Sequence, residues 1–507
     1  MTSYAPSRAP QSRPLVIGVV AVVAVGVLLR LYTASDLWLD EALTVNIARL
    51  PLGELHGALK MDGAPPLYYV LLHLWTAVFG VSDVAARSLS GLIAIATLPL
   101  AWLAGRRAGG RVTGWCALVV IASSPYAIRY ATEARMYALE ILLVFAGIIA
   151  FRRALERPTA TRAASVGLIA ALLAYTQYWS FYLLAVVFVL LVVMAGRGPH
   201  RVAARRMLVA VAIGGIAFGP WVPTFLYQSA HTGTPWGEAV LPGIPIGETL
   251  RDFAGGAEHE GWLLLFPMTA LMLLGIFGAA AGNRRIEIDL HTQRDVRWEA
   301  LVGLATMVLG TSVSFLSGSA FQTRYSAIVF PFYVVVAARG LSCFADRRVL
   351  AGMGSVVVAL GFVGGARSLV ENRTQAGEVA SVLRAEAAEG DLVIYCPDQL
   401  GPSVHRLAPV GLDEVTYPFF ASPERVDWVD YAERVASVDP ARFAVAALAR
   451  AGRDHAIWLV SGPGYRTHAG RCEALAATLE ASRPAVTRVI SDERVWERPG
   501  LTEFAAP

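Results

Sequence analysis

The sequence predicts an α-helical, multi-pass membrane protein with an α/β domain at its C-terminal end. Of its 507 residues, 55% are hydrophobic and only 16% are charged, whereas soluble domains carry about 25% charged residues. Apolar runs of about 20 residues, long enough to cross a bilayer as helices, recur as far as residue 366. Beyond that residue the composition becomes polar. This balance argues against a disordered, nucleic-acid-binding or purely soluble protein.

Eleven apolar stretches predict the membrane-spanning helices. The stretch from residue 163 to residue 196 is too long for one span and short for two, and the polar segment 177–180 marks the expected turn between a pair. The predicted spans cover residues 14–32, 88–105, 112–129, 136–151, 163–177, 179–196, 207–225, 261–281, 298–316, 326–343 and 349–366.

The placement of arginine predicts how these spans are oriented, because short cytoplasmic loops are rich in Lys and Arg. If the further apolar stretch 65–80 crossed the membrane, the basic loops would fall on opposite sides. We therefore expect 65–80 to lie at the outer interface, with Tyr68, Tyr69 and Trp75 as anchors. The expected cytoplasmic clusters are Arg8/Arg13, Arg106/Arg107/Arg111, Arg152/Arg153/Arg157/Arg162, Arg197/Arg201/Arg205/Arg206, Arg284/Arg285/Arg294/Arg297 and Arg347/Arg348.

This orientation divides the chain into three parts. Residues 1–13 form a cytoplasmic tail, 14–366 form the membrane domain with its outer loop at 33–87, and 367–507 form an extracytoplasmic α/β domain. Alternating strand-like and helix-like patterns predict that last domain. Its expected strands lie at 391–396 and 455–462, and its expected helices at 374–389, 440–452 and 469–482.

Two features of the C-terminal domain leave alternatives open. Cys396 and Cys472 form either a disulfide, which an extracytoplasmic compartment permits, or two buried free thiols. The segment Ser461–Gly464 after the second strand is either an anion-binding turn or, more commonly for such a sequence, a plain loop.

The first outer loop concentrates acidic residues where the first span leaves the membrane. Asp40 and Glu41 are adjacent there. A carboxylate at this position can act as a general base toward a hydroxyl, and a second can hold a divalent cation through oxygen. The alternative is that the pair only begins an amphipathic helix, whose dipole favours acids in the first turn. The acids of this loop are Asp36, Asp40, Glu41, Glu54 and Asp62.

Two other outer segments place arginine and tyrosine at the membrane boundary, namely Tyr126–Tyr137 and Phe321–Tyr325. Arginine at membrane depth is usually paired or functional, and its guanidinium binds phosphate bidentately. Acids together with arginines suit an acceptor hydroxyl and a phosphate leaving group. Snorkelling of Arg135 and Arg324, or pairing of Arg135 with Glu133, is the alternative.

Three segments, taken in order, resemble the GT-C glycosyltransferases: Trp38–Ala42, Ala64–Tyr69 and Glu133–Tyr137. The resemblance is nearest to the branch of protein mannosyltransferases and aminoarabinose transferases. It covers about residues 30–140 by motif and the rest of the membrane domain by its pattern of spans. It implies a polyprenyl-phosphate sugar donor, an acceptor hydroxyl on a cell-envelope glycan or glycolipid, and inverting transfer on the outer side of the cytoplasmic membrane.

The same resemblance implies roles for individual residues. Asp40 would be the catalytic base, and Glu41 would support it or bind Mg²⁺ or Mn²⁺ together with Asp62. Many members carry His before the Pro-Pro pair, whereas Asp62 stands near that place here. Residues His56 and His73 are weaker metal candidates. The residues expected at the donor phosphate are Arg129, Arg135, Tyr137, Arg324 and Tyr325.

Other activities are excluded or less favoured. A P-loop requires lysine, and the only lysine, Lys60, is not in such a motif. No two of the 16 aspartates are two residues apart, so the Asp-x-Asp signature of nucleotide-sugar enzymes is missing, and we expect no nucleotide. A flippase of lipid-linked sugars would need polar residues at the bilayer midplane and paired halves. An envelope scaffold that acts through its C-terminal domain is a third hypothesis.

Overall fold

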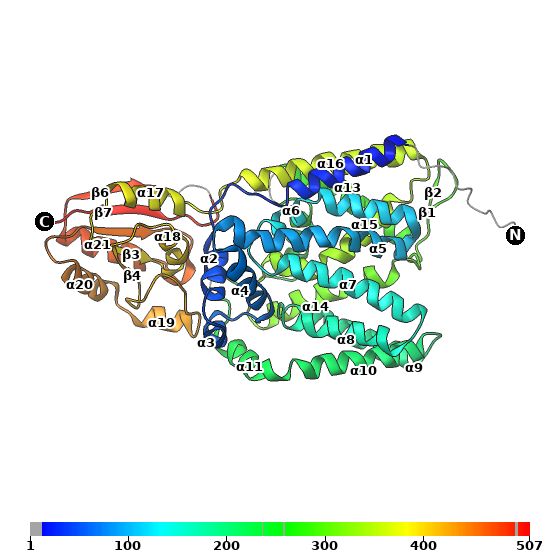
Figure 1. The fold of residues 1–507 in the computed structure, drawn as a ribbon, viewed down its shortest axis with the longest axis horizontal. Coiled ribbons are helices and arrows are strands. Elements are labelled where there is room, and N and C mark those ends of the chain that lie inside the picture. Colours follow the sequence, from blue (N-terminus) through cyan, green and yellow to red (C-terminus); the bar gives the residue numbers. More distant parts are fainter. Residues whose placement is uncertain (1–12, 236, 257–258, 492–494) are drawn as a thin grey trace.

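The computed structural model describes residues 13–235, 237–256, 259–491 and 495–507. A long bundle of helices carries a smaller α/β part at one end, where the C-terminus lies, and the N-terminal helix begins toward the opposite end (Figure 1). The helices that run along the bundle are α1 (Arg13–Leu28), α5 (Asp83–Ser123), α7 (Tyr137–Glu156), α8 (Ala160–Ala174), α9 (Ser180–Gly196), α10 (Arg201–Ala217), α13 (His259–Phe277), α14 (Arg297–Leu316), α15 (Phe330–Leu341) and α16 (Arg347–Val370).

Each predicted span overlaps a helix, and the doubtful stretch 163–196 forms the two helices α8 and α9 with its turn at the predicted place. By length and apolar composition, four helical stretches of the described residues are long enough to cross a membrane, and several shorter apolar helices accompany them. The four lie at 83–123, 201–231, 297–316 and 347–370. The protein is therefore a multi-pass membrane protein, while the count of eleven spans stays a prediction.

Helix α5 corresponds to two of the predicted spans, which together form a helical hairpin. The backbone leaves the helical conformation at Gly109 and Gly110, and Gly110 has a φ of +88°, which glycine adopts without steric cost. A Cβ added to Gly105 would lie 2.8 Å from the Cβ of Ala117. The two arms therefore pack closely side by side, and the predicted spans 88–105 and 112–129 correspond to them.

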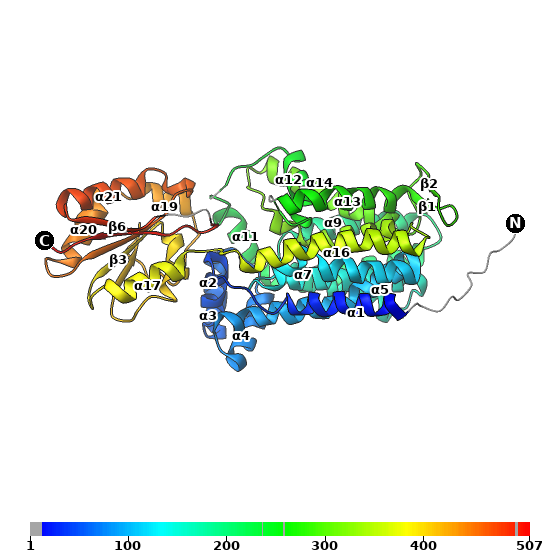
Figure 2. The same cartoon turned by 90° about the horizontal axis from the view of Figure 1, so that it is seen from above.

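Short helices cover the end of the bundle that faces the C-terminal part. Figures 1 and 2 show α2, α3 and α4 at this end, between the bundle and the sheet. Helix α4 is the stretch predicted to lie at the interface. The short elements outside the long helices of the bundle are α2 (Leu39–Ala48), α3 (Leu52–Asp62), α4 (Leu67–Phe79), α6 (Pro125–Ala131), η1 (Gly219–Trp221), α11 (Val222–His231), α12 (Gly243–Phe253) and η2 (Thr323–Ile328).

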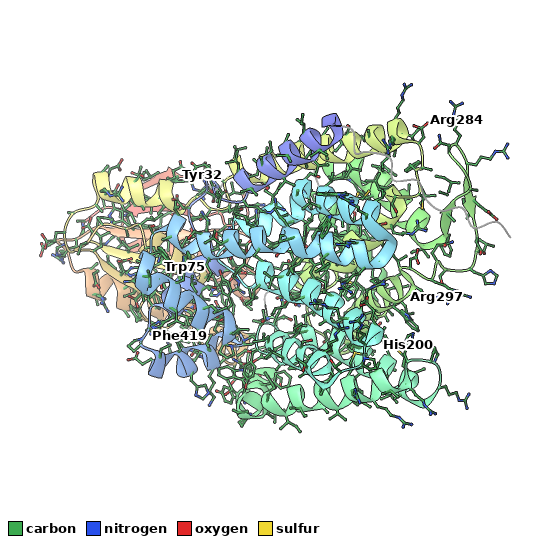
Figure 3. The ribbon with its side chains drawn as sticks, turned by 45° about the vertical axis from the view of Figure 1, so that its right-hand side comes forward. Tyr32, Trp75, His200, Arg284, Arg297 and Phe419 are labelled. Atoms are coloured by element: carbon green, nitrogen blue, oxygen red, sulfur yellow. A yellow bond between two sulfur atoms is a disulfide. The ribbon has the colours of Figure 1, made fainter. Side chains whose placement is uncertain are left out.

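The other end of the bundle carries the arginine-rich loops. Figure 3 shows Arg284, Arg297 and His200 there, far from Trp75 and Phe419. A small hairpin of β1 (Gly278–Ala280) and β2 (Ile286–Ile288) also lies at this end. The basic loops are thus separated from the C-terminal sheet by the length of the bundle.

The C-terminal part is built on a five-stranded sheet of order β4-β3-β5-β7-β6. Strands β4, β3 and β5 are parallel, and β7 and β6 are antiparallel to their neighbours. The strands are β3 (Leu392–Cys396), β4 (Asp413–Thr416), β5 (Ile457–Ser461), β6 (Val486–Ile490) and β7 (Gly500–Phe504). The helices are α17 (Ala376–Glu386), η3 (Asp398–Leu400), α18 (Gly401–His405), α19 (Tyr431–Ser437), α20 (Pro440–Ala451), η4 (Arg466–His468) and α21 (Arg471–Ser482).

Helices cover both faces of this sheet, because successive residues of a strand point to opposite sides. Ile394 and Leu459 pack with α20 and α21, whereas Val393 and Trp458 pack with α17 and α18. Strands β3 and β5 and helices α17, α20 and α21 fall on the expected segments. Strands β4, β6 and β7 were not predicted.

One of the two open questions about this part has a structural answer. Cys396, at the end of β3, and Cys472, in α21, form a disulfide. In the segment Ser461–Gly464, Gly462 lies directly against the backbone carbonyl of Arg498.

Candidate active site

Asp40 and Glu41 both lie in the first turn of α2 but meet different surroundings. Consecutive helix residues point about 100° apart, so one carboxylate faces the surface while its neighbour faces the interior. The side chain of Asp40 is 18% exposed and that of Glu41 is 0% exposed. The residue before the helix, Trp38, provides no side-chain hydrogen bond to the helix.

Asp40 faces one arginine of the predicted set. Its Oδ2 lies 3.4 Å from Nη2 of Arg324, a residue of η2. The Arg324 guanidinium also lies near the ring of Trp38, at 5.5 Å from the ring centroid. Within the described residues no hydrogen bond to the Asp40 carboxylate accompanies this ion pair. The carboxylate therefore keeps oxygen lone pairs that a substrate hydroxyl can use.

Arg135 joins the segments that the motifs singled out. Its Nη1 donates to Thr44 Oγ1 at 2.7 Å and lies 3.4 Å from the backbone carbonyl oxygen of Asp40. The same nitrogen lies 3.4 Å from the hydroxyl of Tyr69 in α4. Tyr69 in turn donates to Asp62 Oδ2 at 2.7 Å. Burial raises the pKa of Asp62 above its ordinary value, although the Arg135 guanidinium acts in the opposite direction.

Two tyrosines complete this cluster. The side chain of Tyr137 is buried, its hydroxyl has no partner among the described residues, and it lies within the electrostatic influence of Arg324 and Arg135. Tyr325 stacks on Trp179 with ring centroids 5.9 Å apart. We call the set of Asp40, Asp62, Arg135, Tyr137, Arg324 and Tyr325 the mouth cluster.

Arg129 lies outside the mouth cluster, although it was predicted at the donor phosphate. Its Nε pairs with Glu133 at 3.3 Å, and its guanidinium lies 3.8 Å from the centroid of the Trp496 ring. Its Nη2 is buried without a partner in the described part of the chain. Arg129 is thus turned toward a C-terminal residue.

Glu41 is fully engaged by protein groups. Arg87 donates to its two oxygens from Nε at 2.7 Å and from Nη2 at 2.6 Å. The backbone N–H of Ala134 donates to Oε1 at 2.9 Å, and Nη1 of Arg373 lies 3.8 Å from Oε2. Burial alone raises the pKa of Glu41, but the Arg87 guanidinium, Arg373 and the Ala134 N–H together outweigh burial and hold that pKa below its ordinary value.

This geometry favours a structural role for Glu41 over the catalytic and metal-binding roles predicted for it. Both oxygens already accept short hydrogen bonds, and no surface of the side chain is exposed. We call the set of Glu41, Arg87, Ala134 and Arg373 the buried anchor. It ties α2 to α5, to the loop before α7 and to the start of the C-terminal part.

The predicted metal pair does not fit a cation, because Glu41 has no oxygen left for one. Asp62 accepts its hydrogen bond from Tyr69. His56 hydrogen-bonds with Thr224 and His73 with the carbonyl of Ala48. Elsewhere in the described residues Cys396, His468 and Cys472 lie close enough together to share an ion, but the disulfide occupies both sulfurs.

Several buried arginines at this end of the bundle join helices and loops through hydrogen bonds that were not predicted from the sequence. Arg30 donates to the carbonyls of Ala122 at 2.9 Å and Ile121 at 2.5 Å, which binds the end of α1 to α5. Arg373 donates to the carbonyl and to the hydroxyl of Thr132 at 2.8 Å and 2.9 Å. An arginine inside an apolar stretch was a usable signal for Arg30. No local pattern marked Arg373.

Solved structures of similar fold include those of ArnT and of an archaeal oligosaccharyltransferase. ArnT from Cupriavidus metallidurans in the apo state gives a TM-score of 0.62 at 14% identity, with 97% of this chain and 98% of that chain covered. Its complex with undecaprenyl phosphate gives 0.59 at 13% identity, with 98% and 99% covered. The archaeal oligosaccharyltransferase AglB from Archaeoglobus fulgidus, in complex with an inhibitory peptide and a dolichol-phosphate, gives 0.51 at 12% identity, with 92% and 73% covered.

At these identities the similarity establishes the fold. The chain has the fold of ArnT and AglB, which agrees with the resemblance to the GT-C glycosyltransferases that its three motifs carry. A scan against protein-family models finds no match, and a search of curated proteins finds none either.

Proposed function

We propose that the protein transfers a sugar from a polyprenyl-phosphate donor to a hydroxyl of a cell-envelope glycan or glycolipid, on the outer side of the cytoplasmic membrane. The observation that carries this proposal is the mouth cluster, where the partly exposed Asp40 carboxylate lies beside Arg324 and the Asp40 backbone carbonyl lies beside Arg135. The fold supports the choice of donor, because ArnT binds undecaprenyl phosphate and AglB binds a dolichol-phosphate.

The proposed reaction is a direct displacement with inversion. Asp40 accepts the proton of the acceptor hydroxyl while that oxygen attacks the anomeric carbon. The bond between the anomeric carbon and the phosphate oxygen breaks, and its electron pair leaves with the polyprenyl phosphate. The donor phosphate competes with Asp40 for Arg324, because a guanidinium binds phosphate bidentately. Donor binding therefore frees Asp40 to act as a base.

Charge on the departing phosphate is stabilised by groups that are already in place. Arg135 is held by Thr44, and Tyr137 has a buried hydroxyl that lacks a partner in the described residues. Donors fixed in advance stabilise a developing anion without reorganisation. No step through a metal ion is proposed, because the predicted pair of Glu41 and Asp62 does not fit one.

An apolar pocket within the bundle supports a donor with a long lipid chain. It lies between α7, α8, α9 and α14 and is lined by side chains such as Val144, Leu173, Val187 and Val302. Its one acidic residue, Glu299, is paired with Arg152 at 2.6 Å. Aliphatic walls of this kind suit isoprenoid units, and we propose that the polyprenyl chain enters here.

The positions of the basic loops support the proposed orientation. These loops lie at the end of the bundle opposite to α2, the helix that carries Asp40 (Figures 1 and 3), and cytoplasmic loops are the ones enriched in arginine. Reporter fusions after residues 60, 108 and 380 should read outside, inside and outside. Any other pattern contradicts the proposed sidedness.

The deciding experiment is an assay of the purified full-length protein with a panel of polyprenyl-phosphate sugars. Asp40→Asn should lower turnover about 10²- to 10⁴-fold, which is the usual contribution of a general base, while the protein stays in the membrane. Glu54→Gln is the matched control, since Glu54 is an exposed acid on α3. Full turnover by Asp40→Asn, or turnover of no donor by the unsubstituted protein, would overturn the proposal.

A further inference from the structure

A segment near the C-terminus reaches back to the helix that carries Asp40. Glu497 is buried and lies just before β7. Its Oε2 accepts a hydrogen bond from the backbone N–H of Leu39 at 3.2 Å, across 458 residues of chain. Its Oε1 accepts from the hydroxyl of Ser403 at 2.8 Å. Glu497 thus occupies the N-terminus of α2.

This contact supplies a hydrogen-bond acceptor that the N-terminus of α2 otherwise lacks. The first N–H groups of a helix have no partner within the helix and need an acceptor. Trp38 precedes the helix and supplies no side-chain acceptor. Leu39 is the first residue of α2 and Asp40 is the second. The Glu497 carboxylate therefore holds the same turn that presents Asp40.

The neighbouring residues fix Glu497 in this position. Its backbone N–H donates to the carbonyl of Arg373 at 2.9 Å, and Arg373 belongs to the buried anchor. The ring of Trp496 lies 3.8 Å from the Arg129 guanidinium and meets Trp38 edge to face with centroids 5.8 Å apart. The segment is thus attached to the buried anchor and to Trp38, which directly precedes α2.

We propose that Glu497 is a positioning residue for Asp40, through which the C-terminal part of the chain sets the orientation of the catalytic carboxylate. The proposal rests on the proposed function. An acceptor at the helix N-terminus keeps the first turn of α2 from fraying, and a negative charge there is favoured by the helix dipole. The cap is therefore strongest when Glu497 is charged.

The electrostatics of the site provide a signature for this role. Burial raises the pKa of Glu497 to about 8, although hydrogen bonds from Thr374, Ser403 and the N–H of Leu39 act in the opposite direction, and Asp40 raises it further. Tyr465 also faces this carboxyl, and Arg498 lies near Tyr465. Glu497 is therefore neutral below about pH 8 and charged above it, and the transfer rate should rise as the pH passes through that value.

The test compares Glu497→Gln and Glu497→Ala with Glu473→Gln, which alters an exposed acid in α21. The measurement is kcat and KM of the purified full-length protein against pH, with a donor that the unsubstituted protein turns over. Glutamine keeps an acceptor but no charge, so Glu497→Gln should lose the rise in rate near pH 8. Alanine removes the cap, so Glu497→Ala should lower kcat about tenfold, as loss of a helix cap implies, with KM little changed.

Asp40→Asn, assayed in parallel, distinguishes a failure of the proposed function from a failure of the positioning role of Glu497. Full activity of Asp40→Asn means that the proposed function fails. If Asp40→Asn is inactive while Glu497→Gln keeps both the kcat and the rise near pH 8, only the positioning role of Glu497 fails. Glu497→Gln decides the matter if Glu497→Ala does not reach the membrane.

Discussion

Asp40 and Glu41 are neighbours in sequence, yet each meets a different arginine in a different environment. In the mouth cluster, Asp40 and Arg324 are both partly exposed and lie 3.4 Å apart. In the buried anchor, Arg87 grips both oxygens of a Glu41 that has no exposed surface. A partly exposed pair contributes little to stability, whereas removing one partner of a buried pair is costly. The comparison therefore separates a carboxylate that can react from one that holds the helix.

The largest expected effect is a loss of stability when the buried anchor is broken. Arg87→Met leaves Glu41 buried without its main partner, which costs about 3–5 kcal/mol in similar cases. Unfolding of the purified protein in mixed micelles should show this loss. Arg324→Met is the matched control, and its unfolding free energy should change by less than about 1 kcal/mol, because Asp40 can turn to water. Equal losses in the two variants would contradict the distinction.

The second prediction concerns catalysis at the mouth cluster. Arg324→Gln removes a charge proposed to stabilise the departing phosphate, and loss of one such group typically lowers kcat about 10²- to 10³-fold. Stability should stay unchanged. Arg49→Gln serves as control, because Arg49 is exposed at the end of α2. The proposed role of Arg324 is lost if Arg324→Gln has the kcat of Arg49→Gln.

Much of the fold could be predicted from the sequence. The apolar stretches are long, so each overlaps a helix, and the three motifs carry a resemblance to the GT-C glycosyltransferases with which the observed fold agrees. The two arms of the α5 hairpin correspond to two predicted spans, and a tight turn at Gly109 and Gly110 joins them. Helix α1 ends at Leu28 instead of residue 32, and Arg30 turns back to the carbonyls of Gly26 and Ala122.

The site was predictable only where local motifs carry it. The structure brings Asp40, Arg135 and Arg324 together at one end of the bundle. The roles of Glu41 and Glu497 could not be predicted, because their partners are remote in sequence. Arg87 lies 46 residues from Glu41, and Leu39 lies 458 residues from Glu497. No periodicity or spacing connects such pairs.

A smaller effect tests how Arg135 is held in the mouth cluster. Thr44→Val keeps the shape of the side chain and removes the acceptor at 2.7 Å from Arg135 Nη1. A hydrogen bond to a charged group is worth about 1.5–3 kcal/mol, so kcat/KM should fall about tenfold or somewhat more. Thr478→Val, on an exposed helix face, should leave kcat/KM unchanged. Normal kcat/KM in Thr44→Val would mean that Thr44 does not position Arg135.

The smallest expected effect distinguishes the two clusters by pH. Glu41 has a folded-state pKa below its ordinary value, so it contributes stability above that ordinary pKa and loses it as the pH falls through the folded-state pKa. Asp62 has a folded-state pKa above its ordinary value. Its contribution is complete below the ordinary pKa and is lost as the pH rises through the folded-state pKa. As the pH falls, protonation of Glu41 therefore lowers the free energy of unfolding, whereas protonation of Asp62 raises it.

Asp62→Asn isolates the contribution of Asp62 to the pH dependence of stability, because asparagine has the same shape and does not titrate. At acidic pH the variant and the unsubstituted protein should unfold with similar free energies. As the pH rises, the variant should become the more stable of the two, since the unsubstituted protein must then keep a buried charge beside Tyr69. The measurement is the unfolding free energy of both proteins in mixed micelles across the acidic range. A constant difference at every pH would show that Asp62 keeps its ordinary pKa in the folded protein, and the contrast between the clusters would then rest on Glu41 alone.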